Sequence, residues 1–255
     1  FGKYHEAIKA FGSYLKDNAE PAPRRDALYM LGMSYYWTGV YSQVPVTLGE
    51  VTANKDALTQ NAYLHMGLAY LQLADKNKAR MAFEQAAASD ADLKIKEQAS
   101  YNNALCIHET SYSAFGESVT VFENFLNEFP NSAYADKVSS YLVEVYMNTR
   151  SYDAALKSIE RITHPGRAIL EAKQKILFQL GTQSFANTQF EQAIGCFNQS
   201  IALGGYNLQT KTDALYWRGE SYYRLNRMQE AARNFNDYLS LTPQKNTEMY
   251  ALAYY

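Results

Sequence analysis

The side chains that most often carry catalysis or bind metal ions, histidine and cysteine, are few and scattered in this chain. Only Cys106 and His108 bring a thiol and an imidazole close together in the sequence. Two positions apart on a helix, their side chains point about 200° away from each other, so they cannot meet at one substrate or metal ion. Because no HExxH or CxxC motif occurs either, the sequence predicts no metal site and no cofactor. Cys106 and Cys196 are expected to be buried free thiols.

Motifs for phosphate binding and for nucleophilic catalysis are also absent from the sequence. No GxGxxG, Walker-type loop or GxSxG occurs, and Gly204-Gly205 is interpreted as a helix terminator. The acidic residues are scattered over the surfaces of predicted helices. We therefore expect a protein that is not an enzyme.

Composition narrows the range of partners. The 24 basic and 26 acidic residues almost cancel, which leaves no basic surface for nucleic acid or anionic lipid. No apolar run approaches the roughly 20 residues that a membrane-spanning helix needs, so no membrane insertion by this segment is expected. The 22 tyrosines are the unusual feature of the composition.

The helices that would carry any binding site repeat with a nearly constant period. A small residue, usually glycine, precedes a large one by three positions, as Gly32 precedes Tyr35 and Gly67 precedes Tyr70. The small or aliphatic positions are 32, 67, 104, 143, 181 and 219, at steps of 35, 37, 39, 38 and 38 residues. Internal repetition of this length is typical of solenoid proteins.

A second pattern with the same period follows twelve positions later. It consists of a small residue and a large residue four further on, as in Ala79 and Phe83 or Ala193 and Phe197. Apolar residues at this spacing indicate amphipathic helices, here two in each period. We expect the backbone of the second helix to approach the small residue of the first, and the large residue of the second helix to fill the gap to the next pair. Since neither helix can bury its apolar stripe alone, the sequence predicts an all-α fold, an α-α superhelix of stacked antiparallel helical hairpins.

The patterns and turn residues together predict the boundaries of these elements. A lone second helix is expected over 3–15 and the start of a further first helix over 248–255, so that residues 1–255 would form a single array and a fragment of a longer protein. Pro45 should disturb the first turn or two of its helix, and two extra residues near 112–115 should disturb the stacking. Six hairpins are expected, at about 24–50, 59–89, 96–129, 133–163, 168–203 and 211–242.

This pattern resembles the tetratricopeptide repeat over essentially the whole chain, although the usual period of about 34 residues is lengthened to about 38. The resemblance implies that the first helices line the concave side of a superhelix and bind a protein or peptide there. The family's framework occurs in its best form at Leu215, Gly219, Tyr222, Ala231, Phe235 and Pro243.

The resemblance also implies which positions contact the partner: three before, one after, and four and five after the small residue. No lysine occurs in this set, which excludes the family's carboxylate clamp for peptide C-termini. Aromatic residues at both ends of the predicted groove would supply contact area at low entropic cost. The candidate partner-binding residues are Tyr29, Met33, Tyr36, Trp37, Tyr101, His108, Glu144, Met147, Phe178, Phe185, Tyr216, Glu220, Tyr223 and Arg224.

Two stretches, 125–135 with Phe129-Pro130 and 213–223 with Trp217 and Gly219, are similar to repeats of bacterial envelope proteins. These are the Tol–Pal-associated periplasmic cell-division coordinator and the lipoprotein of the outer-membrane β-barrel assembly machine. The similarity implies a periplasmic scaffold of a Gram-negative bacterium, with a cytoplasmic location as the alternative. Two other functions stay open: the interaction or sensor portion of a larger regulator or enzyme, and a glycan-binding outer-membrane lipoprotein.

Overall fold

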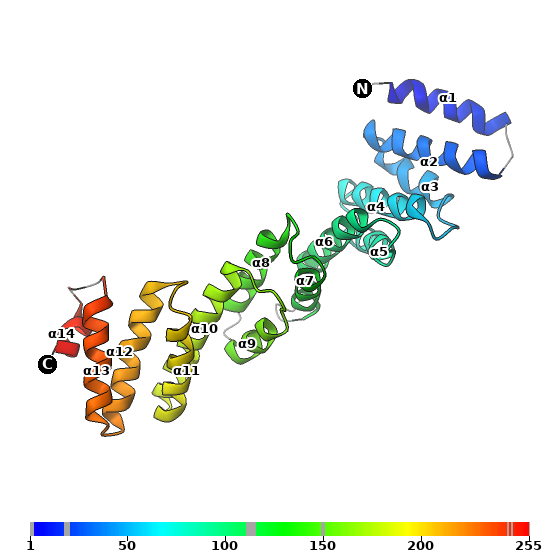
Figure 1. Cartoon of the computed structure of the whole chain (residues 1–255). Coiled ribbons are helices and arrows are strands. Elements are labelled where there is room, and N and C mark those ends of the chain that lie inside the picture. Colours follow the sequence, from blue (N-terminus) through cyan, green and yellow to red (C-terminus); the bar gives the residue numbers. More distant parts are fainter. Residues whose placement is uncertain are drawn as a thin grey trace. The chain divides into compact units, whose positions relative to one another are not determined.

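The fold consists of helices. The computed structural model describes residues 3–17, 21–110, 116–148, 151–243, 245 and 247–254, and every regular element within these ranges is a helix (Figure 1). Consecutive helices form stacked hairpins, so the predicted all-α class is confirmed. The chain folds as two compact units, residues 1–121 and 122–255.

The first unit begins with a single helix and continues with hairpins. α1 packs against α2, α4 against α5, and α5 against α6. One core cluster contains the buried Leu28, Leu48 and Ala62, and the next contains Leu64 and Phe83. The helices are α1 (Tyr4–Asp17), α2 (Pro21–Trp37), the 3-10 helix η1 (Tyr41–Gln43), α3 (Val44–Gly49), α4 (Ala57–Gln72), α5 (Lys76–Ala87), α6 (Leu93–Thr110) and the start of α7 (Glu117–Glu128).

The second unit contains the end of α7 and continues the same arrangement. α10 packs against α11, α11 against α12, and α12 against α13. In Figure 1 these four helices run from yellow-green (α10) through yellow and orange to orange-red (α13). The remaining helices are α8 (Ala135–Asn148), α9 (Tyr152–Glu160), α10 (Arg167–Ala186), α11 (Phe190–Ala202), α12 (Leu208–Arg224), α13 (Met228–Leu241) and α14 (Glu248–Tyr254).

In three hairpins, a glycine of the first helix lies against an aromatic ring of the second, and in the first hairpin Gly32 lies against Leu48. A Cβ atom added at Gly67 would lie 2.5 Å from the ring of Phe83, and one at Gly181 would lie 2.5 Å from the ring of Phe197. The side chain of the second helix thus occupies the space beside the glycine, and the expectation that its backbone does so was wrong. Phe197 also belongs to one buried cluster with Ala214 of the next first helix, as predicted for the gap between hairpins.

The turns inside four of the hairpins share one backbone conformation, seven positions after the small residue. Gly39, Ala74, Thr188 and Asn226 all have a positive φ, between 57° and 77°. The N–H of the following residue donates to a carbonyl near the end of the first helix, as from Gln189 N–H at 2.9 Å. This left-handed termination with its backbone hydrogen bond closes the helix and reverses the chain.

Pro45 has the predicted effect on its helix. The second helix of the first hairpin is divided into η1 and α3, and α3 has six residues with the proline in its first turn. α5 and α11 have 12 and 13 residues. Pro45 lacks an N–H and cannot continue a helix from the preceding residues, so the regular helix starts beside it. The expected insertion near 112–115 lies outside the described residues.

Buried glutamine side chains form hydrogen bonds with the backbone of the turns between hairpins. Gln60 Nε2 donates to the Ser89 carbonyl at 2.6 Å, and its Oε1 accepts from the Asp92 N–H at 2.7 Å. Gln174 makes the same two bonds, both of 2.9 Å, to the backbone of Asn207. Both glutamines are at most 1% exposed, and each satisfies turn groups that would otherwise be buried without a partner.

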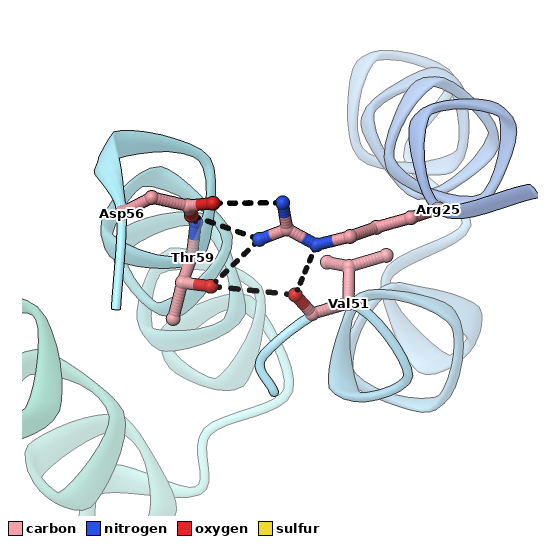
Figure 2. Close-up of polar contacts among 4 residues, drawn as sticks. All are labelled: Arg25, Val51, Asp56 and Thr59. Atoms are coloured by element: carbon pink, nitrogen blue, oxygen red, sulfur yellow. Dashed lines mark hydrogen bonds and ion pairs between the residues drawn. The ribbon is translucent and has the colours of Figure 1, made fainter. Parts of the chain in front are cut away.

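Arg25 occupies the corresponding position in the first hairpin, seven residues before Gly32. Its guanidinium donates two bonds of 2.8 Å to the Asp56 carboxylate and one of 3.0 Å to the Val51 carbonyl (Figure 2). Asp56 in turn accepts from the N–H of Thr59 at 2.9 Å and so caps α4. One arginine therefore joins α2, the loop after α3 and the first turn of α4.

The Asp56 ion pair is expected to make the stability of the first unit sensitive to acid. The Arg25 guanidinium and then the Thr59 N–H hold the pKa of the Asp56 carboxyl well below its usual range. The pair therefore stabilises the fold above about pH 4, the pKa of an unfolded aspartate, and this contribution is lost as the pH falls further. Between about pH 6 and pH 3, the melting temperature of Asp56→Asn should depend less on pH than that of the parent. Asp26→Asn should keep the parent's dependence, and an equal reduction in both variants would contradict the assignment.

Candidate interaction surface

In the first unit, four aromatic side chains and a histidine form a cluster at the end of α2. The Tyr36 ring contacts Trp37, Tyr41 and His65 edge to face, with centroid distances of 5.1, 5.9 and 5.0 Å. Tyr4 of α1 stacks on the Trp37 ring at 6.3 Å. Trp37 is nevertheless 57% exposed, whereas Tyr36 is half-buried. We call Tyr4, Tyr36, Trp37, Tyr41 and His65 the Trp37 cluster; it presents one large, rigidly held ring to solvent.

His65 was not among the predicted site residues. It lies two positions before Gly67, outside the set of positions taken from the family, and no spacing pattern in the sequence marks it. Its Nδ1 lies 3.0 Å from the Asn61 carbonyl, and burial lowers the pKa of its imidazole below the usual value. The ring is therefore neutral at pH 7 and acts as an aromatic neighbour of Trp37.

The other predicted residues of the first unit are less accessible than Trp37. Tyr29 and Met33 are half-buried and pack against the core, and the Tyr29 hydroxyl donates to Asn61 Oδ1 at 2.8 Å. Tyr101 is 6% exposed and His108 is half-buried. The Tyr101 side chain is therefore one of the buried core side chains.

In the second unit, the end of α12 provides the exposed positions. Tyr223 is 53% exposed, and Arg224 lies 3.8 Å from Glu220 in an ion pair one turn away. On α8, Glu144 is exposed and Met147 is half-buried. These residues combine one accessible aromatic ring with charges of both signs.

Three further predicted residues of the second unit pack inside the stack. Tyr216 is 5% exposed, and its ring meets Tyr238 at 5.4 Å. Phe178 and Phe185 are half-buried against the cluster that contains Phe197. Tyr216 was predicted to contact a partner, but its side chain is a core side chain because α13 covers it.

The environment of the Cys106 thiol favours its protonated form. Burial raises the pKa of the Cys106 thiol to about 11, so the thiol is protonated at pH 7. Among the described residues, no three His, Cys, Asp or Glu side chains are grouped so that they could hold a metal ion. None of the described helices is long and apolar enough to cross a membrane.

Comparisons with known proteins agree with this architecture. Residues 60–93 and 178–246 match models of the tetratricopeptide repeat. No curated protein matches the sequence.

Several solved structures are similar to the chain. One is the C-terminal part of a TPR repeat-containing protein from Cytophaga hutchinsonii, with 15% identity, coverage of 98% of this chain and 94% of that chain, and a TM-score of 0.45. A second is Naa15/Naa10 bound to HypK-THB, with 17% identity, coverage of 99% of this chain and 37% of that chain, and a TM-score of 0.52. A third is pilF of Pseudomonas aeruginosa, with 15% identity, coverage of 89% and 95%, and a TM-score of 0.37. The second similarity extends to the fold and no further.

Antiparallel helical hairpins stacked in order define an α-helical repeat protein. The two matching segments, residues 60–93 and 178–246, show that this chain contains tetratricopeptide repeats. Such repeats bind protein partners, and the fold is in general a non-catalytic scaffold. The chain is accordingly a scaffold for protein interaction.

Proposed function

We propose that a partner protein or peptide docks on the surface of the first helices, with Trp37 as the anchor on the first unit and Tyr223 as the anchor on the second. The exposure of Trp37 carries this proposal. A ring of this size is 57% exposed although neighbouring aromatic rings fix its position. Fixed aromatic side chains lose little entropy when a partner covers them, which is why they dominate the binding energy of many interfaces.

Charged residues of the second unit would orient the partner. Glu220 and Arg224 lie on the same helix as Tyr223, and Glu144 is exposed on α8. Such residues at the edge of an interface contribute to specificity and association rate more than to affinity. Docking would thus take its affinity from the aromatic rings and its orientation from the carboxylates and the guanidinium.

The anchors can be tested by affinity capture from the membrane fraction of the source organism. The Trp37→Ala/Tyr223→Ala variant should lose a protein that the parent retains, with a decrease in affinity of at least about tenfold. Its melting temperature should stay within a few degrees of the parent's, since both rings are more than half exposed. Leu241→Ala removes a side chain that is 42% exposed at the end of α13, a second helix outside the proposed surface, and it should capture as the parent does. Equal capture by the parent and the double variant would refute the proposed anchors.

We further propose that this scaffold works in the bacterial cell envelope, most simply in the periplasm. The similarity of the stretches 125–135 and 213–223 to repeats of envelope proteins supports this location. Fractionation of the source organism, with an antibody against this segment, would test it. Recovery in the cytoplasmic fraction would favour a regulator or enzyme subunit, and retention by immobilised glycans would favour a glycan-binding lipoprotein.

A further inference from the structure

The first unit has an apolar groove of about 520 Å³ between α4 and α5. Its most exposed apolar side chain is Met81, at 66%, and Ala82 closes its floor at 5%. We call it the Met66 groove; the residues that define it are Tyr63, Met66, Tyr70, Lys78, Met81 and Glu84.

A polar bridge occupies the corresponding place in the second unit. The Arg218 guanidinium on α12 donates from Nε to Asn234 Oδ1 of α13 and from Nη1 to Asn198 Oδ1 of α11, both at 2.6 Å. Two successive second helices are therefore linked across the face of the first helix between them. The space beside α12 is filled by hydrogen-bonded groups.

The first unit replaces each member of this bridge by a smaller or less polar residue. Met66 precedes Gly67 by one position, as Arg218 precedes Gly219, so Met66 corresponds to Arg218. Ala82 follows Gly67 by fifteen positions, as Asn234 follows Gly219, so Ala82 corresponds to Asn234. In the preceding hairpin, Gly49 follows Gly32 by seventeen positions, as Asn198 follows Gly181, so Gly49 corresponds to Asn198. A Cβ atom added at Gly49 would meet nothing within 4 Å. Gly49 is also the last residue of α3, which is half as long as α5. The groove is thus the place of the bridge, left open and lined by apolar side chains.

The charges around the groove leave one carboxylate unpaired. Lys78 forms an ion pair with Asp75 at 2.9 Å, and Arg80 is paired with Glu117. Glu84 lines the groove and forms no ion pair with any residue that the structure describes. A basic group on a bound molecule would therefore find a free acceptor in Glu84, whereas an acidic group would find Lys78, the one lysine that lines the groove, already paired with Asp75.

We propose that the Met66 groove binds an amphipathic helix of a partner protein, with apolar side chains one turn apart inside the groove and a basic residue paired with Glu84. From Tyr63 to Tyr70 the groove runs along about 10 Å of α4, the length of two helical turns. Apolar grooves of this kind receive helices through residues spaced by three or four, and methionine side chains adapt to the shape of the occupant.

This surface is separate from the one proposed above. Tyr63, Met66 and Tyr70 stand four before, one before and three after Gly67, on the side of α4 that faces α5. Positions one and four after the glycine, which belong to the predicted partner-binding set, point to the opposite side of the helix. Binding in the groove is therefore expected to be independent of the Trp37 cluster.

The ε-methyl NMR signals of methionine can locate a bound helix, because the seven methionines of the chain lie on both units. The probe is a synthetic amphipathic helix of leucine and lysine, compared with a peptide that has the same leucines and glutamate in place of lysine. We expect the leucine–lysine peptide to shift the Met66 and Met81 signals and to leave those of Met228 and Met249 unchanged. It should bind at least about fivefold more tightly than the glutamate peptide.

Variants separate the apolar contact from the charged one. Met81→Ser should weaken the leucine–lysine peptide about tenfold, and Glu84→Gln about two- to fivefold with little effect on the glutamate peptide. Both residues are exposed, so both variants should keep the parent's circular dichroism. Met30→Ser, at a methionine that is 50% exposed on α2, and Trp37→Ala should bind the peptide as the parent does.

Three results would overturn the proposal of a basic helix in the groove. They are shifts spread over all seven methionines, loss of peptide binding in Trp37→Ala, and self-association of the chain that Met81→Ser abolishes. The last result would identify a second copy of the chain as the occupant. None of them depends on whether the anchors of the proposed function are correct, since those are tested by capture of a protein and not by this peptide.

Discussion

Replacement of Gly181 by alanine is expected to lower the free energy of unfolding by about 1–3 kcal/mol, although alanine is the better helix former. A Cβ atom at this position would lie 2.5 Å from Cε1 and 2.7 Å from Cδ1 of the Phe197 ring. The ring is fully buried in one cluster with Ala193 and Ala214, so it cannot move aside without disturbing the next hairpin. Urea unfolding followed by the fluorescence of Trp217, in a Trp37→Phe background, measures the effect in the second unit.

Two other glycines supply matched controls for this prediction. Gly195 lies on the second helix of the same hairpin, and a Cβ atom there would meet nothing within 4 Å. Gly195→Ala should therefore stabilise the unit by about 0.5–1 kcal/mol. Gly219→Ala should cost less than Gly181→Ala, because its nearest ring atom is 2.8 Å away and Phe235 is only half-buried. If Gly181→Ala were as stabilising as Gly195→Ala, the glycine–aromatic contact would not hold the hairpin together.

The sequence predicted these hairpins because the same contact recurs sixteen positions apart, from Gly67 to Phe83 and from Gly181 to Phe197. A contact that requires a small residue opposite a large one restricts the residue types at both positions, so the pattern recurs with the period of the repeat. The polar groups that join one hairpin to the next are harder to recognise, although Arg25, Gln60 and Gln174 share one position of the repeat, because the residue type differs and the bonded partners are not visible in the pattern. Gln60 and Gln174 are single polar residues on otherwise apolar helix faces, and their function depends on backbone groups about thirty residues away.

The sequence indicated which face of the helices carries the candidate surface, but not which residues on that face are exposed. Tyr29 and Tyr216 occupy the same position of the repeat, yet Tyr29 is half-buried and Tyr216 is 5% exposed. The difference arises because the ring of Tyr238, on the following second helix, packs against Tyr216. Spacing fixes the direction of a side chain, whereas its exposure depends on the sizes of the side chains on the helices that pack against it.

Replacement of Arg161 by leucine is expected to destabilise the second unit by about 3 kcal/mol. The side chain of Glu123 on α7 is 4% exposed, and Arg161, just after α9, donates to both of its oxygens at 2.7 and 2.8 Å. Ser158 also donates to this carboxylate and accepts from the Tyr146 hydroxyl, which lies 2.6 Å away. Without the guanidinium the carboxylate would be buried with a single neutral donor, which is far more costly than losing an exposed ion pair. Urea unfolding monitored by Trp217 fluorescence gives the change.

Replacing Glu123 and replacing Arg161 are expected to change the stability of the second unit by different amounts. Only the Arg161 guanidinium is accessible to solvent, so only it can be hydrated when its partner is lost. The Arg161 side chain is 57% exposed, so Glu123→Leu would leave a guanidinium that solvent can hydrate, and the Ser158–Tyr146 hydrogen bond would remain. That variant should therefore lose only about 1 kcal/mol. Arg227→Leu, which breaks exposed ion pairs with Glu191 and Glu230, should not change the unfolding curve measurably. If Glu123→Leu were as destabilising as Arg161→Leu, the penalty would come from lost packing between α7 and α9 and not from an unpaired buried charge.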